Sequence, residues 1–383
     1  FRVFFATLWL NTDIANPLNV SQLAMLHPAA SPLPLGVHQA SQAGREAALA
    51  SQRSRRLKAS FLATASVLTR RTPSSSLGFG ATEPRNLVAM GGIFGQASVP
   101  EYFDGKVVWI TGASGGFGEA LALSLAQDAN LKGLILSARR QDALERVKES
   151  CLKMARELQV KVLPLDLAKI DSLPQAAAEA KNFFGEVGIL INNGGIGFRG
   201  LGEETEIEID QMVMNVDYFS GVVLTKSLLP DWLEKGQGHV VQVSSVQGFF
   251  GLPGRTAYAA AKHAALGFYD SLRAEVADRG VYVTTVCPGY IATGHSQNAA
   301  KGEGVKYPEG HTSKGVLPEV LAPQVLRGIA QKRPEMVPAA LDARAARVLR
   351  NCCPHLLFCI MRRRAQKEAR QRKAHELTEK KSE

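Results

Sequence analysis

The side chains of Ser245, Tyr258 and Lys262 have the types and the spacing needed for proton transfer to an oxygen atom. Tyr258 and Lys262 lie four residues apart in the alanine-rich residues 258–279, which predict a helix, so both side chains share one face. A tyrosine with a pKa of about 10 exchanges protons poorly near neutral pH, but a cation roughly 4–6 Å away stabilises its phenolate. We therefore expect Tyr258 to protonate a developing alkoxide while Ser245 hydrogen-bonds the carbonyl oxygen.

A glycine-rich turn earlier in the chain predicts a nucleotide site. An apolar, strand-like run leads into residues 111–118, and the helix-like residues 119–127 follow. A strand, a glycine turn and a helix in this order form a site for a diphosphate at a helix N-terminus. Gly112 then permits the tight turn, Gly116 lets the backbone approach the diphosphate, and Gly118 allows close packing of the helix on the strand. The alternative is an ordinary flexible turn.

The end of the second predicted strand favours NADP(H) over NAD(H). An NAD site usually has Asp or Glu near this point to bind the ribose 2′-hydroxyl, but here Ala138 is followed by Arg139 and Arg140. A guanidinium binds a 2′-phosphate through paired, charge-assisted hydrogen bonds. We expect Arg139 to select NADP(H). The alternative is that the two arginines form a solvated helix start.

Strand-length apolar runs alternate with helix-length segments from Lys106 onward. The runs lie at residues 107–110, 134–136, 160–163, 189–191, 239–243 and 282–287. This rhythm predicts an α/β fold, a Rossmann-type doubly wound parallel sheet in a single domain with helices on both faces. Asp166 follows the third run, where a carboxylate can accept a hydrogen bond from an adenine amino group, and residues 192–195 follow the fourth run.

The composition excludes several classes of protein. The 383 residues are 45% apolar and 21% charged, which is ordinary for a globular protein. Of the net charge of +10, residues 1–89 carry +6 and residues 361–383 carry +5, whereas residues 90–360 carry −1. We expect no nucleic-acid partner, because such a protein needs its positive charge on the folded body. The five cysteines lack metal-ligand spacing, so we expect no metal site, and a reducing compartment fits best.

The sequence predicts three parts. Residues 1–89 predict a disordered segment, either a targeting sequence or a product of gene prediction with Met90 as the true start. Residues 90–335 are the predicted NAD(P)-binding catalytic domain. Residues 336–383 predict a helical, basic tail, either a packing helix with a solvated end or a peripheral contact with an anionic membrane.

Together these motifs resemble the short-chain dehydrogenase/reductase family over about residues 104–300. The matching features are the glycine turn, Asp166, residues 192–195, Asn215, Ser245, Tyr258, Lys262 and Pro288-Gly289. The resemblance implies an NADP(H)-dependent oxidoreductase that interconverts a carbonyl and a secondary alcohol. It places Asn215 in a proton relay, through a water that links it to Lys262, and gives Lys262 a second role at the nicotinamide ribose. Gly194 departs from the family, which usually has Ala there.

The motifs and the resemblance give two groups of expected site residues. The catalytic group is Asn215, Ser245, Tyr258 and Lys262. The cofactor-binding group is Gly112, Ser114, Gly116, Phe117, Gly118, Arg139, Asp166, Leu167, Asn193, Gly194, Gly195, Tyr258, Lys262, Pro288, Gly289, Ile291 and Thr293. The alternative function is a non-catalytic protein that senses NADP(H) or scaffolds a partner.

Residues 255–264 and 288–291 are similar to the branch of the family related to 11β-hydroxysteroid dehydrogenases. That similarity implies a small-molecule substrate that is lipid-like or steroid-like, with acyl- or alkyl-dihydroxyacetone phosphate as one option. It also implies a homo-oligomer. The expected location is the cytoplasm, or the cytoplasmic face of the endoplasmic reticulum or peroxisome membrane, with organelle import as the alternative.

Overall fold

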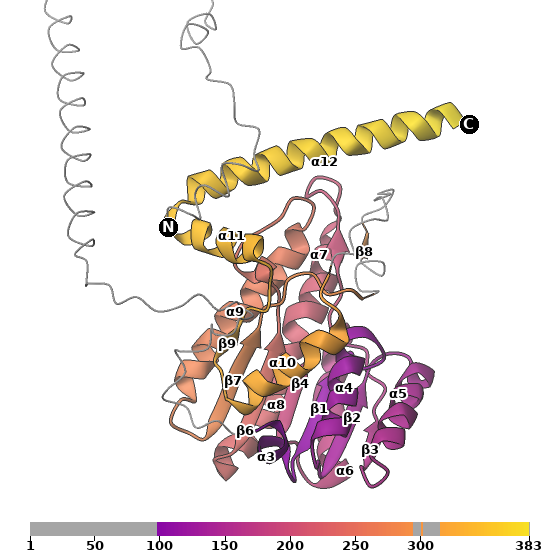
Figure 1. Cartoon of the computed structure of the whole chain (residues 1–383), viewed down its shortest axis with the longest axis vertical. Coiled ribbons are helices and arrows are strands. Elements are labelled where there is room, and N and C mark those ends of the chain that lie inside the picture. The colour runs from indigo at the N-terminus through magenta and orange to yellow at the C-terminus, as the bar shows by residue number, and fades with distance from the viewer. Residues whose placement is uncertain (1–97, 294–299, 302–314, 383) are drawn as a thin grey trace, which may run out of the picture. The chain divides into compact units, whose positions relative to one another are not determined.

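Seven parallel strands form the main sheet in the computed structural model, which describes residues 98–293, 300–301 and 315–382 (Figure 1). Their order is β3-β2-β1-β4-β6-β7-β9. In chain order they are β1 (Val107–Thr111), β2 (Gly133–Ser137), β3 (Val160–Val162), β4 (Ile189–Asn192), β6 (Gly238–Val243), β7 (Val281–Val286) and β9 (Glu335–Met336). The chain therefore builds outward from β1 in both directions, which confirms the predicted Rossmann-type fold.

Helices cover both faces of this sheet because its strands are apolar on both sides. One face packs against α4 (Gly116–Asp128), α5 (Gln141–Met154) and α10 (Pro318–Ala330). The other face packs against α6 (Leu173–Phe184), α8 (Ser220–Lys235) and α9 (Thr256–Glu275). The helix α3 (Val99–Phe103) precedes β1, and α7 (Ile207–Met214) runs into a π-helical turn at Asn215–Phe219.

The strand β1 shows why the sheet is buried on both sides. Successive side chains of a strand point to opposite faces, and in β1 all five residues are buried. Val108 and Ile110 join the core beneath α4, α5 and α10, whereas Trp109 joins the core beneath α6 and α8. The indole Nε1 of Trp109 donates to the Ser137 hydroxyl at 2.9 Å, so the polar atom of this buried ring is satisfied.

The strand order reverses between β1 and β4, which lie side by side although the chain visits β2 and β3 between them. In parallel sheets of this kind, ligands bind outside the carboxyl ends of the strands at such a reversal. Thr111 ends β1 and Asn192 ends β4. A second, two-stranded sheet, β5 (Phe198–Arg199) with β8 (Ala300–Lys301), follows β4 in the chain.

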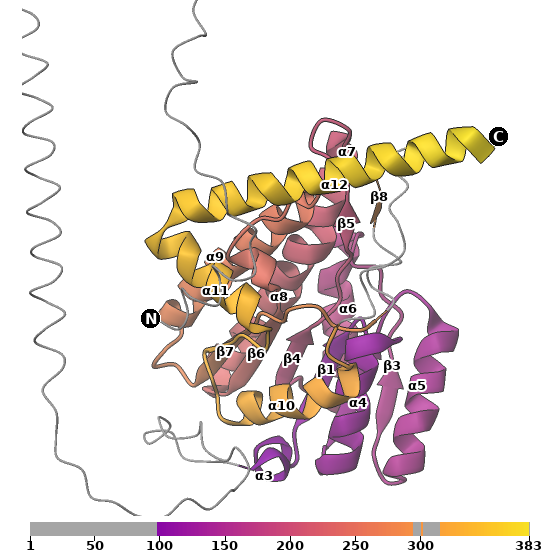
Figure 2. The same ribbon diagram turned by 45° about the horizontal axis from the view of Figure 1, so that its top comes forward.

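The predicted helical tail consists of α11 (Leu341–Cys352) and α12 (Pro354–Ser382). Leu357 of α12 is buried against Val246 and Phe250, and Arg372 lies 3.8 Å from Glu204. In Figures 1 and 2, α12 crosses the same end of the molecule as α7 and β5. Among the helices described, none is both long and apolar enough to cross a membrane.

The three-part division stays a prediction. Residues 1–89 lie outside the described residues. The predicted boundary at residue 335 falls at β9, and this strand pairs with β7 of the main sheet. The tail therefore follows directly from the last strand of the sheet.

Candidate active site

The glycine turn packs tightly against the segment after β4. Gly112 has a φ of +67°, and a Cβ placed on it would lie 2.7 Å from Gly194 Cα. A Cβ on Gly118 would lie 2.3 Å from the Gly112 carbonyl oxygen. The Asn193 amide nitrogen donates to the carbonyl oxygens of Thr111 and Gly112 at 3.0 and 3.2 Å. Four of the predicted cofactor residues, Gly112, Gly118, Asn193 and Gly194, thus pack into one compact turn.

The outer side of this turn remains open to a ligand. A Cβ on Gly115 would meet only the tip of Glu119, at 3.9 Å, and α4 begins at the next residue. The first N–H groups of a helix lack partners within the helix, so they can bind a diphosphate. Thr293 lies close enough to touch a Cβ on Gly116, at 3.0 Å, which closes the turn from the β7 side. This arrangement fits a dinucleotide.

The residues predicted to hold the adenosine half line the neighbouring strand ends. Arg139 is exposed in the bend after β2, and the Asp166 carboxylate accepts from the Ala168 amide at 3.1 Å. Leu167 packs against position 194, where a Cβ would lie 2.4 Å from Leu167 Cδ1 and would require that side chain to move. The remaining members of the predicted cofactor-binding group, Pro288, Gly289, Ile291 and Thr293, follow β7 rather than the strands of the adenosine half.

Ser245, Tyr258 and Lys262 meet beyond the carboxyl end of β6. The Lys262 ammonium lies 5.3 Å from the centre of the Tyr258 ring, and the Ser245 side chain hydrogen-bonds the phenol. Both Tyr258 and Lys262 come from the first two turns of α9, as the helical spacing predicts. The Ser245 oxygen also accepts from the Gln247 amide at 3.2 Å, which fixes the side chain at the start of a short 3₁₀ turn, Val246–Gly248.

Asp217 is the functional residue that the sequence analysis missed. Its carboxylate Oδ2 lies 3.6 Å from the Lys262 ammonium, with side chains 0% and 5% exposed respectively. The other carboxylate oxygen accepts from the Ile196 amide at 2.7 Å. A Cβ at position 195 would lie 2.8 Å from Asp217 and 3.5 Å from Lys262, so Gly195 leaves room for this ion pair.

Asn215, predicted in the proton relay, lies two residues before Asp217 in the π-helical turn. Within the described residues no polar contact joins Asn215 to Lys262, whereas Asp217 makes one. The role of Asn215 in a proton relay stays a prediction, and Asp217 is the residue of this turn that pairs with Lys262.

The electrostatics of the site also differ from expectation. Burial raises the pKa of Tyr258, and although Lys262 acts to lower it, the nearby Asp217 carboxylate raises it further. Burial alone would lower the pKa of Lys262, but the Asp217 and Tyr258 charges raise it above its ordinary value. Lys262 is therefore a firmly charged ammonium, and Tyr258 is a protonated phenol at neutral pH.

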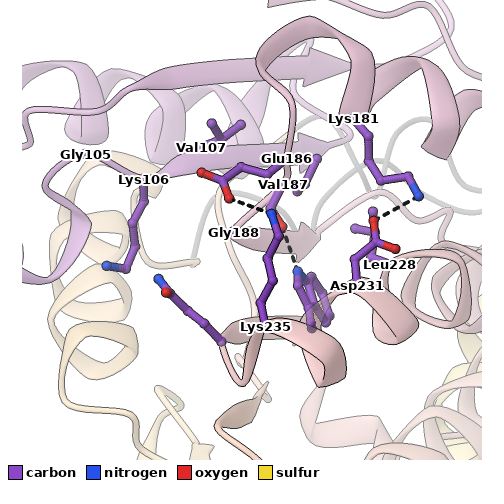
Figure 3. A pocket seen from close by; sticks show the side chains of 12 residues that line it. Gly105, Lys106, Val107, Lys181, Glu186, Val187, Gly188, Leu228, Asp231 and Lys235 are labelled. Carbon is purple, nitrogen blue, oxygen red and sulfur yellow. Dashed lines mark hydrogen bonds and ion pairs between the residues drawn. The ribbon is translucent and has the colours of Figure 1, made fainter.

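A second hollow lies at the opposite end of the sheet, at the amino ends of β1, β4 and β6 (Figure 3). It encloses about 60 Å³ and is bordered by two surface ion pairs, Lys235 with Glu186 and Lys181 with Asp231, each at 3.0 Å. Four of its lining charges form these two pairs, and the carboxyl ends of the strands lie at the other end of the sheet. This hollow takes no part in the site described above.

Comparison with known proteins identifies the family. The family model for short chain dehydrogenases matches residues 106–304, which include the glycine turn, Asp217 and the Ser245, Tyr258 and Lys262 group. The chain belongs to the short-chain dehydrogenase/reductase family. It is an oxidoreductase that acts on CH–OH groups with NAD(P).

Relatives within this family cover most of the folded part. The chain is 45% identical over 267 residues to the Drosophila melanogaster dehydrogenase/reductase SDR family protein 7-like, across 69% of this chain and 81% of that protein. It is 38% identical over 273 residues to SDR family member 7B of Xenopus tropicalis, across 70% and 88%. A short-chain dehydrogenase/reductase from Burkholderia phymatum, in complex with NAD, shares the fold, with a TM-score of 0.59, 24% identity and coverage of 67% and 96%.

Proposed function

We propose that this enzyme uses NADP(H) to interconvert a carbonyl and a secondary alcohol, with Tyr258 as the proton donor and acceptor. The observation that carries the proposal is the meeting of the buried Ser245 and Lys262 with the half-buried Tyr258. A phenol, a hydroxyl and an ammonium in contact provide what carbonyl reduction demands of a protein: a proton, an oxygen ligand and a fixed positive charge.

Each of these side chains has a distinct task in the proposed reaction. Ser245 donates a hydrogen bond to the carbonyl oxygen and orients it toward Tyr258. The Tyr258 hydroxyl gives its proton to that oxygen as negative charge develops. Lys262 lies beside the Tyr258 ring and binds the nicotinamide ribose. The bound cofactor supplies the hydride. In the oxidation direction Tyr258, as phenolate, takes the proton back.

The cofactor preference is proposed from Arg139. This residue is exposed at the end of β2, where a guanidinium can reach a ribose 2′-phosphate. Arg139→Asp should weaken NADPH binding by about 10–100-fold, because hydrogen bonds to charged groups contribute roughly 1.5–3 kcal/mol, while NADH binding is retained. The measurement is titration of both cofactors by NAD(P)H fluorescence. Arg156→Asp makes the same charge change beyond the far end of α5 and should leave both affinities unchanged. An unaltered preference in Arg139→Asp contradicts the assignment.

Thermal unfolding of the full chain with NADPH, with NADH and with neither tests the function. A ligand at about 100 times its dissociation constant adds roughly 2.7 kcal/mol to the folded state, about 5–11 °C for a domain of this size. The proposal expects the larger shift from NADPH and turnover of ketones in the same preparation. A shift without turnover of any ketone would favour the NADP(H) sensor instead.

A lipid-like or steroid-like substrate, such as acyl- or alkyl-dihydroxyacetone phosphate, completes the proposal. Its support is the similarity to SDR family member 7B and the apolar surface beside the site. Val246 and Phe250, just after Ser245, pack against Leu357 of the tail, and Phe358 in the next position is 51% exposed. The substrate side is therefore bordered by apolar side chains and by a tail with an open apolar face.

The same tail is proposed to rest on an anionic membrane surface. Phe358 and Leu356 are exposed beside the exposed Arg362 and Arg363, which is the combination that an interfacial helix needs. Reversing both charges, Arg362→Glu with Arg363→Glu, should lower binding to phosphatidylserine vesicles by about 30-fold or more, since each arginine contributes roughly 1 kcal/mol. Co-sedimentation measures this, and Arg279→Glu with Arg156→Glu is the matched control. Equal binding by both double variants would remove the tail from the membrane contact.

A further inference from the structure

We propose that Asp217 is a positioning residue of this active site: its carboxylate binds the Lys262 ammonium, offsets the positive charge beside Tyr258, and holds Tyr258 in its proton-donating form. The inference rests on the proposed function, since it concerns the group that supplies the proton. It adds a residue that the sequence motifs did not assign, and it concerns the pH range in which each direction of the reaction is fast.

The position of Asp217 suits this task. The carboxylate is fully buried and lies 3.6 Å from the ammonium of Lys262, and Gly195 leaves the space that the pair occupies. The Ile196 amide donates to the other carboxylate oxygen and fixes its direction. A buried ion pair is costly to desolvate and adds little net stability, so this pair is better explained by its position than by its contribution to folding.

The ion pair of Asp217 and Lys262 changes the electrostatic potential at the Tyr258 hydroxyl. A lone ammonium next to a phenol favours the phenolate, because opposite charges attract strongly in a buried site. With a carboxylate against the ammonium, the net charge of the pair is zero and Tyr258 faces a dipole whose effect falls off faster with distance. Lys262 therefore lowers the pKa of Tyr258 less than it would without Asp217.

The other groups around the Asp217–Lys262 pair do not bring the pKa of Tyr258 down to its ordinary value. Ser245 and Arg255 also face Tyr258 and favour its ionisation, but burial and Asp217 act against them, and the pKa of Tyr258 stays above its ordinary value. Cys287 faces Lys262 from the end of β7, and burial raises the pKa of its thiol to about 12, so it is neutral there. Among the described residues, these groups do not outweigh burial and the Asp217 carboxylate.

The pKa of Tyr258 decides the pH range in which each direction of the reaction is fast. Carbonyl reduction needs the phenol and is lost as the pH rises through the pKa of Tyr258. Alcohol oxidation needs the phenolate and is gained over the same interval. A raised pKa of Tyr258 therefore lets reduction continue to alkaline pH and restricts oxidation to alkaline pH. Asp217→Asn keeps the size of the side chain and an oxygen for the Ile196 amide, but it removes the charge.

The decisive test is a near-ultraviolet titration of the Tyr258 phenolate. The full chain and its Asp217→Asn variant are each titrated against the same protein carrying Tyr258→Phe, and the difference isolates this tyrosine. We expect Asp217→Asn to move the half-point of the Tyr258 transition down by about 1 pH unit or more. Asp270→Asn, which removes an exposed carboxylate paired with Arg273, is the control and should not move it. A half-point that is unchanged or higher in Asp217→Asn overturns the proposal.

A second pair of variants covers the outcome in which Asp217→Asn does not fold. Lys262→Met leaves the carboxylate alone beside Tyr258, whereas Asp217→Asn combined with Lys262→Met leaves no buried charge from the pair. The single variant should titrate Tyr258 at a higher pH than the double variant. Equal half-points for the two proteins also overturn the proposal.

Turnover gives a readout that a purely structural role would not move. With NADP⁺ and 1-phenylethanol as the probe, Asp217→Asn should gain about tenfold in oxidation rate near neutral pH, and its alkaline loss of acetophenone reduction should begin at a lower pH. The titration needs neither cofactor nor substrate. A shifted half-point in a protein that reduces no ketone would therefore reject the proposed function and keep the role of Asp217.

Discussion

Replacement of Tyr258 by Phe should lower the rate of carbonyl reduction by about 10²–10⁴-fold while NADPH still binds. Only the hydroxyl is removed, and the ring that packs beside Lys262 remains. Without the hydroxyl, the developing alkoxide must take its proton from water, and Ser245 loses the group that it hydrogen-bonds. The measurement is the initial rate of NADPH consumption over a panel of ketones, with the thermal shift by NADPH recorded on the same protein.

The matched control is Tyr282→Phe, which removes a hydroxyl from a 38% exposed ring near the amino end of β7. That variant should keep full activity. If Tyr258→Phe retained more than about a tenth of the rate, the proton would have to come from another donor. The trio of Ser245, Tyr258 and Lys262 would then be an accident of packing.

Replacement of Gly118 by Ala should destabilise the folded enzyme by about 3 kcal/mol and abolish nucleotide binding. The added Cβ would lie 2.3 Å from the Gly112 carbonyl oxygen and 2.6 Å from the Asn193 amide nitrogen. The first of these is backbone, which cannot rotate away, so α4 must shift off β1 at the cost of an overpacked core. Differential scanning calorimetry should show a midpoint lower by about 6–12 °C.

Gly115→Ala tests whether this loss comes from crowding or from the loss of any glycine. Its Cβ would meet only the end of Glu119, at 3.9 Å, and its φ of 172° is extended backbone that alanine adopts freely. The midpoint of Gly115→Ala should stay within about 2 °C of the parent. A similar fall in both variants would place the cause in helix propensity rather than in the contact with Gly112.

The sheet was predictable because its strands are buried on both faces. All six apolar runs correspond to strands within one residue at each end, from β1 to β7. The seventh strand, Glu335–Met336, has only two residues and carries no pattern of its own. It pairs with β7 because the preceding helix, α10, returns the chain to that edge. Its existence depends on packing that a local sequence window does not contain.

Helix starts were less predictable, for a local physical reason. The first helix after the glycine turn was expected at Glu119, since glycine weakens helices, but α4 begins at Gly116. The tight contacts of Gly118 with Gly112 require the helix to start inside the turn. Glycine is selected there by space and by the approach of a ligand, and both outweigh its poor propensity.

Residue type guided the choice of Asn215 for the relay, and that choice stays a prediction. Asn215 has the expected amide, but the buried face of this segment runs through Val213, Asp217, Ser220 and Leu224. That spacing of three and four residues was readable in the sequence and points to Asp217. The π-helical turn at Asn215–Phe219 was not readable, and it completes the alignment of Asp217 with Lys262.

The order of strands in the sheet has a consequence for folding while the chain is synthesised on the ribosome. The chain makes β1, β2 and β3 first, yet one edge of β1 is completed only by β4, where Val108 pairs with Ile189. At 5–20 residues per second, that edge waits unpaired for roughly 4–16 s while the chain between the two strands is synthesised. During this interval the most apolar strand of the fold offers free backbone groups to any other nascent chain. The edge of β1 is therefore open to wrong pairing until β4 has been synthesised.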